Sequence, residues 1–374
     1  MATDKLGLYV HIPYCVRKCS YCDFCSLPTP TRCVPDGYVA RLADEIRGYR
    51  SFGRPKLSTV YFGGGTPSLL SPDQLCKIVS AIREIFTVCD GAEITFEANP
   101  GTLSEEKARA FKDEGFNRVS LGLQSIHEKE MKTLGRIHNF DDFVRSFSIL
   151  REVGFDNVNV DLMYGIPHQT TESFLETMSC VASFSPEHIS AYGLIIEEGT
   201  PFYNERHALP IPDADTESDM YALCCETLAS LGYSHYEISN YARAGYESEH
   251  NLLYWRMKDY IGVGASAHSF YLGRRYSNTD CISEYISSTG IGFSTADTLD
   301  TADARYEYAM LALRLSEGLS LSEYSERFGV SFTEGKEELI ERFCREGLMR
   351  LDNGRLSITE SGFYVSNSIL VEIL

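Results

Sequence analysis

The chain has 374 residues, of which 43% are apolar and 23% are charged, and its formal net charge at pH 7 is −19. This composition is typical of a globular protein and excludes a mostly disordered, collagen-like or membrane-embedded chain. At roughly 150 residues per domain, the length predicts two to three domains. The negative charge repels phosphate backbones and anionic lipid, so we expect no nucleic-acid partner.

The sequence contains no candidate for a membrane span, because no stretch reaches roughly 18 uninterrupted apolar residues. Its start, MATDKLGLYVHIPYC, runs into a strand pattern without an export signal. We therefore expect a cytoplasmic protein, whose 12 cysteines stay reduced. Most of the cysteines lie in apolar or helical contexts and are expected to be small core residues. These are Cys76, Cys89, Cys180, Cys224, Cys225, Cys281 and Cys344.

Strand and helix patterns alternate along the first two thirds of the chain. The expected strands are 6–12, 58–62, 93–98, 118–124, 157–164, 188–196 and 236–241. The clearest helix presents one apolar face over 75–86 and opens with a capping box at Ser71, Pro72 and Gln74. Two further helices are expected around 143–150 and 220–231. This alternation predicts an α/β fold with a parallel sheet, either open or closed into a full or partial barrel.

Residues that follow successive strands favour the barrel. They are Gly63–Pro67, Glu97–Asn99, Gln124 with Ser125, and Asp161 with Tyr164 and Gly165. A parallel barrel gathers its active site at this rim. The alternative is that strands simply end in turn-forming residues, but Glu97, Gln124 and Asp161 are not turn choices. We therefore expect a common pocket at the rim.

The pattern changes after about residue 300. Helices are expected over 302–315, 320–328 and 334–346, followed by two short strands within 348–358. We therefore divide the chain into a domain over 1–240, a linker region over 241–300 and a small α+β, winged-helix-like domain over 301–374. Because 334–346 has more acidic than basic residues, a packing or lid role is favoured over DNA binding.

Three cysteines near the start have the spacing C-x3-C-x2-C. Cys15, Cys19 and Cys22 directly follow the first strand, and such a loop can place three thiolates around one corner of an iron–sulfur cube. One iron of the cluster would then have no protein ligand. Zinc is the competing metal, but a structural zinc site has four ligands, commonly supplied by two separated C-x2-C pairs. No second such pair follows in this chain. Four ligands would close the cluster, so we expect Cys25 to be a neighbouring thiol that does not bind it.

The chain resembles the radical S-adenosylmethionine (SAM) superfamily, and more narrowly the oxygen-independent coproporphyrinogen oxidase family. The motifs that carry this resemblance are Tyr9–Phe24, Tyr61–Ser68, Glu97–Pro100, Ser120–Ser125, Leu134–Arg136 and Asp161–Pro167. The resemblance implies a partial (β/α)6-type barrel that holds a [4Fe-4S] cluster and SAM. The open iron would bind the amino and carboxylate groups of SAM.

The resemblance also implies a set of SAM-binding residues. They are Tyr9, Tyr21, Gly64, Gly65, Thr66, Glu97, Gln124, Arg136 and Asp161. The glycines would let backbone approach the ligand. Glu97 can accept from an ammonium or ribose hydroxyl, Arg136 can bind the carboxylate, and Asp161 can accept from the ribose. Without the resemblance, an isolated Arg or Asp is more often a surface ion-pair partner.

One motif favours a heme-chaperone group within the family over the true dehydrogenases. That group carries H-N-x-x-Y-W, which here runs from His250 to Trp255, the only tryptophan. The dehydrogenases have a longer N-terminal arm and a C-x3-C-x2-C-x-C run. The resemblance implies heme binding by His250, Tyr254 and Trp255. The alternative is structural, with Trp255 as a core anchor and His250 as a satisfied polar group.

The implied function is a heme chaperone that accepts heme and passes it to a membrane-bound respiratory enzyme. The resemblance also allows for an electron donor such as a flavodoxin or ferredoxin as a partner, and it is compatible with a homodimer. Two alternatives remain: an oxygen-independent coproporphyrinogen III dehydrogenase, which converts propionates to vinyl groups, and a heme-modifying radical enzyme.

Overall fold

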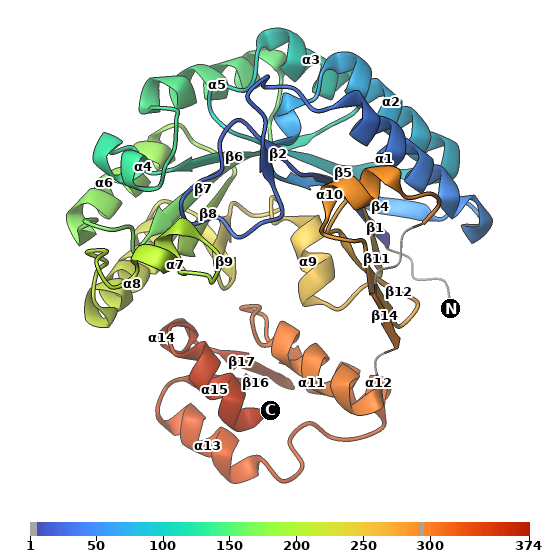
Figure 1. Cartoon of the computed structure of the whole chain (residues 1–374). Helices are drawn as coiled ribbons and strands as arrows, with labels where there is room; N and C mark the ends of the chain where they lie inside the picture. The colour runs from blue at the N-terminus through green and yellow to red at the C-terminus, as the bar shows by residue number, and fades with distance from the viewer. Residues whose placement is uncertain (1–5, 292–294, 299) are drawn as a thin grey trace.

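A computed structural model describes residues 6–291, 295–298 and 300–374. Residues 1–5, at the start of the chain, and residues 292–294 and 299, within the expected linker, lie outside the described residues. A sheet of 12 strands forms the larger domain, and a small domain of helices and three strands follows it (Figure 1). The sheet is open, because its strand order runs from β14 at one edge to β9 at the other.

Six parallel strands form the centre of this sheet, in the order β1-β4-β5-β6-β7-β8. They are β1 (Leu6–Ile12), β4 (Lys56–Gly64), β5 (Thr87–Ala98), β6 (Arg118–Gln124), β7 (Val158–Tyr164) and β8 (His188–Gly193). The helices between them are α1 (Asp36–Gly48), α2 (Pro72–Ile85), α3 (Glu105–Asp113), α4 (Glu128–Thr133), α5 (Phe140–Val153) and α6 (Thr171–Ser183), and α7 (Pro201–Glu205) and α8 (Ala214–Ser230) follow β8. Most of them lie along the outer face of the sheet (Figure 1). The predicted partial barrel is confirmed.

Helix α2 forms as its sequence predicts. The Ser71 hydroxyl accepts from the Gln74 backbone N–H, and the Gln74 side chain accepts in return from the Ser71 N–H, so the predicted capping box is present. The apolar residues of the helix, such as Leu75 and Ile78, are buried against the sheet. Burial of one apolar face, more than helix propensity, holds such a helix in place.

The strand predicted over 236–241 is instead a hairpin. Strands β9 (Ser234–Glu237) and β10 (Asn240–Ala242) pair with each other, and β10 also pairs antiparallel with β8. The Glu237 carboxylate accepts from the backbone N–H of Ser239 and from the Asn240 side chain, so a buried polar group fixes the turn. The alternation of side chains continues through such a tight turn, which is why the sequence looks like one strand.

The region over 241–300, treated above as a linker, adds strands to the same sheet. Strand β11 (Tyr260–Val263) pairs parallel with β1, and β12 (His268–Tyr271), β13 (Arg274–Ser277) and β14 (Thr295–Thr298) extend it antiparallel. Helices α9 (Glu249–Trp255) and α10 (Ile282–Ser287) lie in the same region. These strands are only four residues long, and glycines lie within β11 and between β12 and β13, so their pattern is weak. A Cβ on Gly262 would lie 2.1 Å from the His268 carbonyl oxygen, which explains that glycine.

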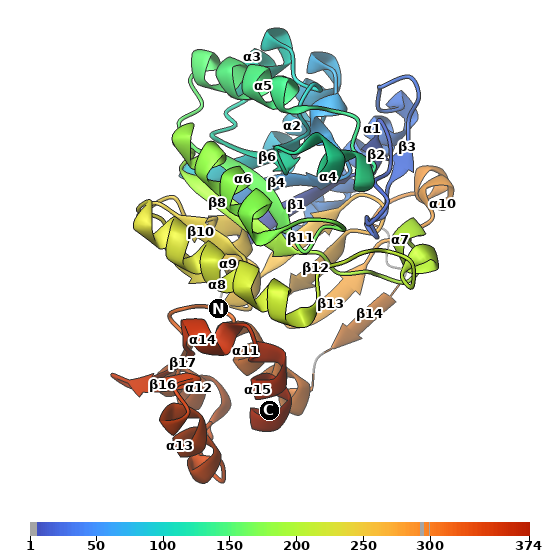
Figure 2. The same ribbon diagram turned by 90° about the vertical axis from the view of Figure 1, so that its left-hand side faces the viewer.

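The C-terminal domain packs beneath the sheet domain (Figure 2). Its elements are α11 (Thr301–Ala312), β15 (Leu319–Ser320), α12 (Leu321–Phe328), α13 (Glu337–Arg345), β16 (Met349–Asp352), β17 (Arg355–Ile358), α14 (Glu360–Phe363) and α15 (Ser366–Ile373). Two further short strands, β2 (Tyr14–Cys15) and β3 (Leu27–Pro28), pair in the loop after β1. Among the described residues, no helix has both the length and the hydropathy needed to cross a membrane.

Candidate functional site

A cavity of about 410 Å³ lies at the C-terminal ends of the parallel strands and reaches into the barrel. It is lined by most of the residues that the sequence singles out: Cys15, Cys19, Cys22, Tyr21, Gly64, Gly65, Glu97, Gln124, Arg136 and Asp161. Two of the expected SAM residues, Tyr9 and Thr66, do not line it. The rim residues of five different strands are thus brought to one place, as the barrel predicts.

Two side chains donate hydrogen bonds to the cysteine sulfurs. The Thr66 hydroxyl lies 3.5 Å from Cys15 Sγ, and Arg136 Nη1 lies 3.6 Å from Cys19 Sγ. Such donors favour a thiolate, the form that binds metal. Burial opposes them: it raises the pKa of the Cys15 thiol, and it raises that of Cys22 to about 11. Binding of a metal group here would therefore release protons.

No group of three or more His, Cys, Asp or Glu side chains is arranged around a single metal ion among the residues that the structure describes. The three thiols line one wall of the 410 Å³ cavity, called the first cavity below, instead. A multi-iron cube with protein sulfur at three corners needs such a wall with free space beside it. The donor set therefore fits the cluster that the cysteine spacing implies.

The cysteine loop is held by backbone contacts to several elements. The Ser20 N–H donates to the Leu134 carbonyl, the Phe202 N–H donates to Ser20, and the Gly65 N–H donates to Ile12. Gly65 has no room for a side chain, since a Cβ there would lie 2.7 Å from backbone atoms of Ile12 and Tyr14. Gly65 also lines the cavity, where it is predicted to let backbone approach the ligand. Its lack of a side chain has a second effect, because it lets the end of β4 pack against the start of the cysteine loop.

Glu97 sits between the cavity and the glycine run. Its carboxylate accepts from the Tyr61 hydroxyl at 2.9 Å and from the Gly64 N–H at 3.0 Å. Burial, with a contribution from the negative charge of Asp161, raises the pKa of Glu97 to about 7. A cationic ligand group beside it would restore the charged form. Glu97 is therefore suited to bind an ammonium or hydroxyl donor, as expected.

Asp161, Gln124 and Arg136 are held in place by neighbouring strands. Ser120 and the Asn159 amide donate to the two oxygens of Asp161, at 2.9 and 2.7 Å. Arg136 donates through Nη2 to the Gly122 carbonyl at 2.7 Å, while its buried Nε makes no hydrogen bond among the described residues. Gln124 has a φ of 77° at a register shift of β6, which redirects its side chain. The unused Nε leaves Arg136 with capacity for an anionic group.

Cys25 faces a different cavity from the other three cysteines. That second cavity, of about 450 Å³, is also lined by Tyr9, Tyr254 and His268. The Cys25 thiol donates to the Asp280 carbonyl at 3.3 Å. Tyr9 likewise lines this second cavity and not the first, and its hydroxyl bonds His11 Nδ1 at 2.9 Å.

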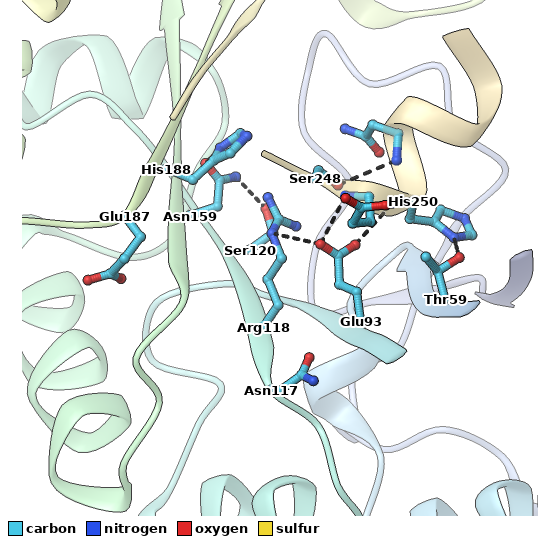
Figure 3. Close-up of polar contacts among 12 residues, drawn as sticks. Thr59, Glu93, Asn117, Arg118, Ser120, Asn159, Glu187, His188, Ser248 and His250 are labelled. Carbon is cyan, nitrogen blue, oxygen red and sulfur yellow. Dashed lines mark hydrogen bonds and ion pairs between the residues drawn. The ribbon is translucent and has the colours of Figure 1, made fainter. Parts of the chain in front are cut away.

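The H-N-x-x-Y-W residues lie on α9 and do not converge on one site. His250 is 1% exposed, and its Nδ1 bonds Thr59 Oγ1 at 2.7 Å (Figure 3). Its Nε2 bonds the Tyr254 hydroxyl, also at 2.7 Å. It lines none of the cavities described here. Trp255 lines a separate groove against the C-terminal domain, together with Arg355. In this conformation His250 has no free nitrogen for heme iron, so the alternative of a satisfied polar group describes its geometry.

A prediction about pH follows from this burial. Burial, aided by the nearby positive charge of Arg118, lowers the pKa of His250 to about 3, against 6.5 for an exposed histidine. Below pH 6.5 the unfolded chain therefore binds a proton at His250 that the folded chain does not bind. The free energy of unfolding falls as the pH drops through this range. Between pH 7.5 and 5, the free energy of unfolding of the wild type should fall by about 2 kcal/mol more than that of His250→Gln.

Urea denaturation at the two pH values measures this difference. The other histidines are common to both proteins and cancel in the comparison. An equal loss in the two proteins would contradict the neutral, buried state of His250.

Arg118 is a cavity residue that the sequence analysis did not select. It opens β6, whose residues are all buried, and its side chain reaches the cavity. Its Nε lies 3.9 Å from the Glu93 carboxylate (Figure 3). The sequence offers one signal for Arg118, namely a charged residue in a strand whose other residues are expected to be buried.

The whole chain is similar to several known proteins. The description "Radical SAM superfamily" matches residues 9–181, and "HemN C-terminal domain" matches residues 299–365. The chain is 34% identical to the heme chaperone HemW of Bacillus subtilis, covering 96% of this chain and 97% of that protein. It is also 34% identical to HemW of Escherichia coli, over 98% and 97%. The solved structure of coproporphyrinogen III oxidase (HemN) from Escherichia coli matches with a TM-score of 0.86 at 23% identity, over 99% of this chain and 90% of that one.

The barrel, the cysteine loop and these matches define a member of the radical SAM superfamily. The superfamily implies a [4Fe-4S] cluster and SAM as cofactors. Within it, the chain belongs to the family of the heme chaperone HemW.

Proposed function

We propose that this protein is a heme chaperone that binds heme, a [4Fe-4S] cluster and SAM, and delivers heme to respiratory enzymes at the membrane. The observation that carries the proposal is the identity of 34% to HemW proteins over nearly the whole chain, with both domains included. The cavity supports it, because the three cysteines and a set of polar rim residues face one space.

Each part of the site has a role in this proposal. Cys15, Cys19 and Cys22 hold the cluster, which supplies a redox-active iron with an open coordination position. Thr66 and Arg136 donate to two of the thiolates and stabilise their charge. Glu97, Gln124 and Asp161 lie across the cavity from the loop and bind the polar groups of SAM.

Heme needs a place of its own, and the second cavity offers one. It lies beside the first, sharing Gly64 and Glu97 as a wall, and it is lined by the aromatic rings of Tyr254 and Tyr260. His268, which is exposed, reaches the same space. Aromatic rings and an accessible imidazole suit a flat macrocycle and its iron. In this arrangement Tyr254 contacts heme as expected, and His250 supports Tyr254 through their hydrogen bond.

The test is transfer of heme by the reconstituted, oxygen-free protein. The heme-loaded chain is mixed with membrane vesicles that contain a heme-free respiratory oxidase, and oxidase activity is followed. We expect activity to return with the loaded chain and not with the heme-free chain. The same protein, given reductant, SAM and coproporphyrinogen III, should leave that porphyrinogen unchanged. Formation of protoporphyrinogen IX would overturn the proposal in favour of the dehydrogenase.

A further inference from the structure

The floor of the first cavity, which the three cysteines line, holds a buried arginine without a role in the proposed SAM or cluster sites. Arg118 is only 2% exposed, yet it lines the cavity together with Ser190 of β8 and Asn251 of α9. These three residues come from the deep end of the barrel, away from the cysteine loop. A guanidinium is thus presented to an internal space that a ligand can enter.

The charge of this guanidinium is poorly compensated within the protein. Its Nε is buried and makes no hydrogen bond to any described residue, and the Glu93 oxygen 3.9 Å away is beyond hydrogen-bond reach. Glu93 itself accepts from the backbone N–H groups of Glu249 and His250, at 3.0 and 3.1 Å. It therefore shares its charge between Arg118 and the start of α9 (Figure 3).

Two other carboxylates, Glu97 and Asp161, lie near enough to interact with the charge of Arg118, and both are already engaged. Glu97 accepts from the Tyr61 hydroxyl and the Gly64 N–H. Both oxygens of Asp161 accept hydrogen bonds from Ser120 and Asn159, and none joins Asp161 to Arg118. Burying a cation that lacks hydrogen-bond and charge partners costs free energy. An anionic group of a bound ligand would supply the missing partner of Arg118. The planar guanidinium fork matches a carboxylate, which it can bind through two parallel hydrogen bonds.

The position of Arg118 separates this subsite from the cysteine loop. Arg118 and Gln124 are the first and last residues of β6, and a seven-residue strand spans roughly 20 Å. A carboxylate on the floor therefore lies at the opposite end of β6 from Gln124, although the charge of Arg118 still acts on Glu97 and Asp161.

We propose that Arg118 anchors a carboxylate-binding subsite on the floor of the first cavity, and that this subsite takes a propionate of a porphyrin. The porphyrin ring itself lies in the second cavity, which shares Gly64 and Glu97 with the first. The porphyrin rests on the proposed function, whereas the carboxylate chemistry rests on Arg118 alone. The amino-acid carboxylate of SAM is the other source of the same group, and the experiment separates the two.

The experiment measures the affinity of the full-length protein for heme, for heme dimethyl ester, in which both propionates are methylated, and for SAM. Four proteins are compared: wild type, Arg118→Lys, Arg118→Gln and the control Arg109→Gln, which alters an exposed arginine paired with Glu105 on α3. We expect the wild type and the control to bind heme about 10- to 100-fold more tightly than the ester. Arg118→Gln should lose this preference and keep its affinity for SAM. Arg118→Lys should keep part of the preference, since it retains the charge without the fork.

The wild-type comparison of heme with its ester needs no variant, so the test stands even if a substitution prevents folding. Equal binding of heme and ester, with unchanged SAM affinity in Arg118→Gln, would overturn the subsite. A loss of SAM affinity with an unchanged preference for heme over its ester would overturn the porphyrin assignment and give the subsite to SAM. A wild type that binds no heme at all would refute the proposed function, while the SAM measurement would still decide whether Arg118 binds a carboxylate.

Discussion

Replacing Cys22 with serine is expected to abolish the iron–sulfur cluster, whereas replacing Cys25 leaves it intact. Cys22 lines the first cavity with Cys15 and Cys19, and Cys25 faces the second cavity and donates to the Asp280 carbonyl. A cube held at three corners does not survive the loss of one of them. Iron content after anaerobic reconstitution should fall from about four per chain to close to zero in Cys22→Ser.

Cys25→Ser is the matched control, because it makes the same change three residues away in the same loop. Its iron and sulfide content and the electron paramagnetic resonance signal of the reduced cluster should match the wild type. A loss of iron in this variant would mean that all four cysteines bind the cluster, and that no iron remains open for SAM. Stoichiometric zinc in the wild type would contradict the cluster itself.

The central sheet could be predicted from the sequence because its signals are local. Strands β1 and β6 have the predicted bounds, since each is a run of buried residues between turn signals. The helix over α2 follows from one apolar face and a capping box. The hairpin of β9 and β10 and the added strands β11–β14 were missed. Their formation depends on pairing with β8 and β1, which lie far away in the sequence.

The candidate site could be predicted in part for the same reason. The carboxyl ends of parallel strands lie at the same edge of the sheet, independently of the conformation of the loops. Glu97, Gln124 and Asp161 therefore line one cavity. The H-N-x-x-Y-W motif is different, because seven helical residues point in several directions and only the packing of α9 decides which way each faces. Arg118 was missed because its importance lies in the hydrogen bonds that it does not make, and a sequence cannot display these.

Gly65→Ala is expected to destabilise the protein and to empty the cluster site, although no ligand atom is removed. Its Cβ would lie 2.7 Å from Ile12 O and from the backbone N and O of Tyr14, and backbone at the end of β1 cannot move aside cheaply. Forcing extra volume into such a contact costs about 1 to 3 kcal/mol. Tyr14 immediately precedes Cys15, so the strain falls on the first of the three thiols. Urea denaturation of the metal-free chain should show the loss of stability, and iron content after reconstitution should be well below that of the wild type.

Gly37→Ala provides the control, since a Cβ at Gly37 of α1 meets nothing within 4 Å. That variant should keep its iron and should be as stable as the wild type or slightly more so, because alanine favours a helix over glycine. Normal iron in Gly65→Ala would show that the cysteine loop can shift away from β4 and still hold its cluster. In that case the main role of Gly65 would be to let backbone approach the ligand, as the sequence predicts. The substitution would then lower the affinity for SAM instead.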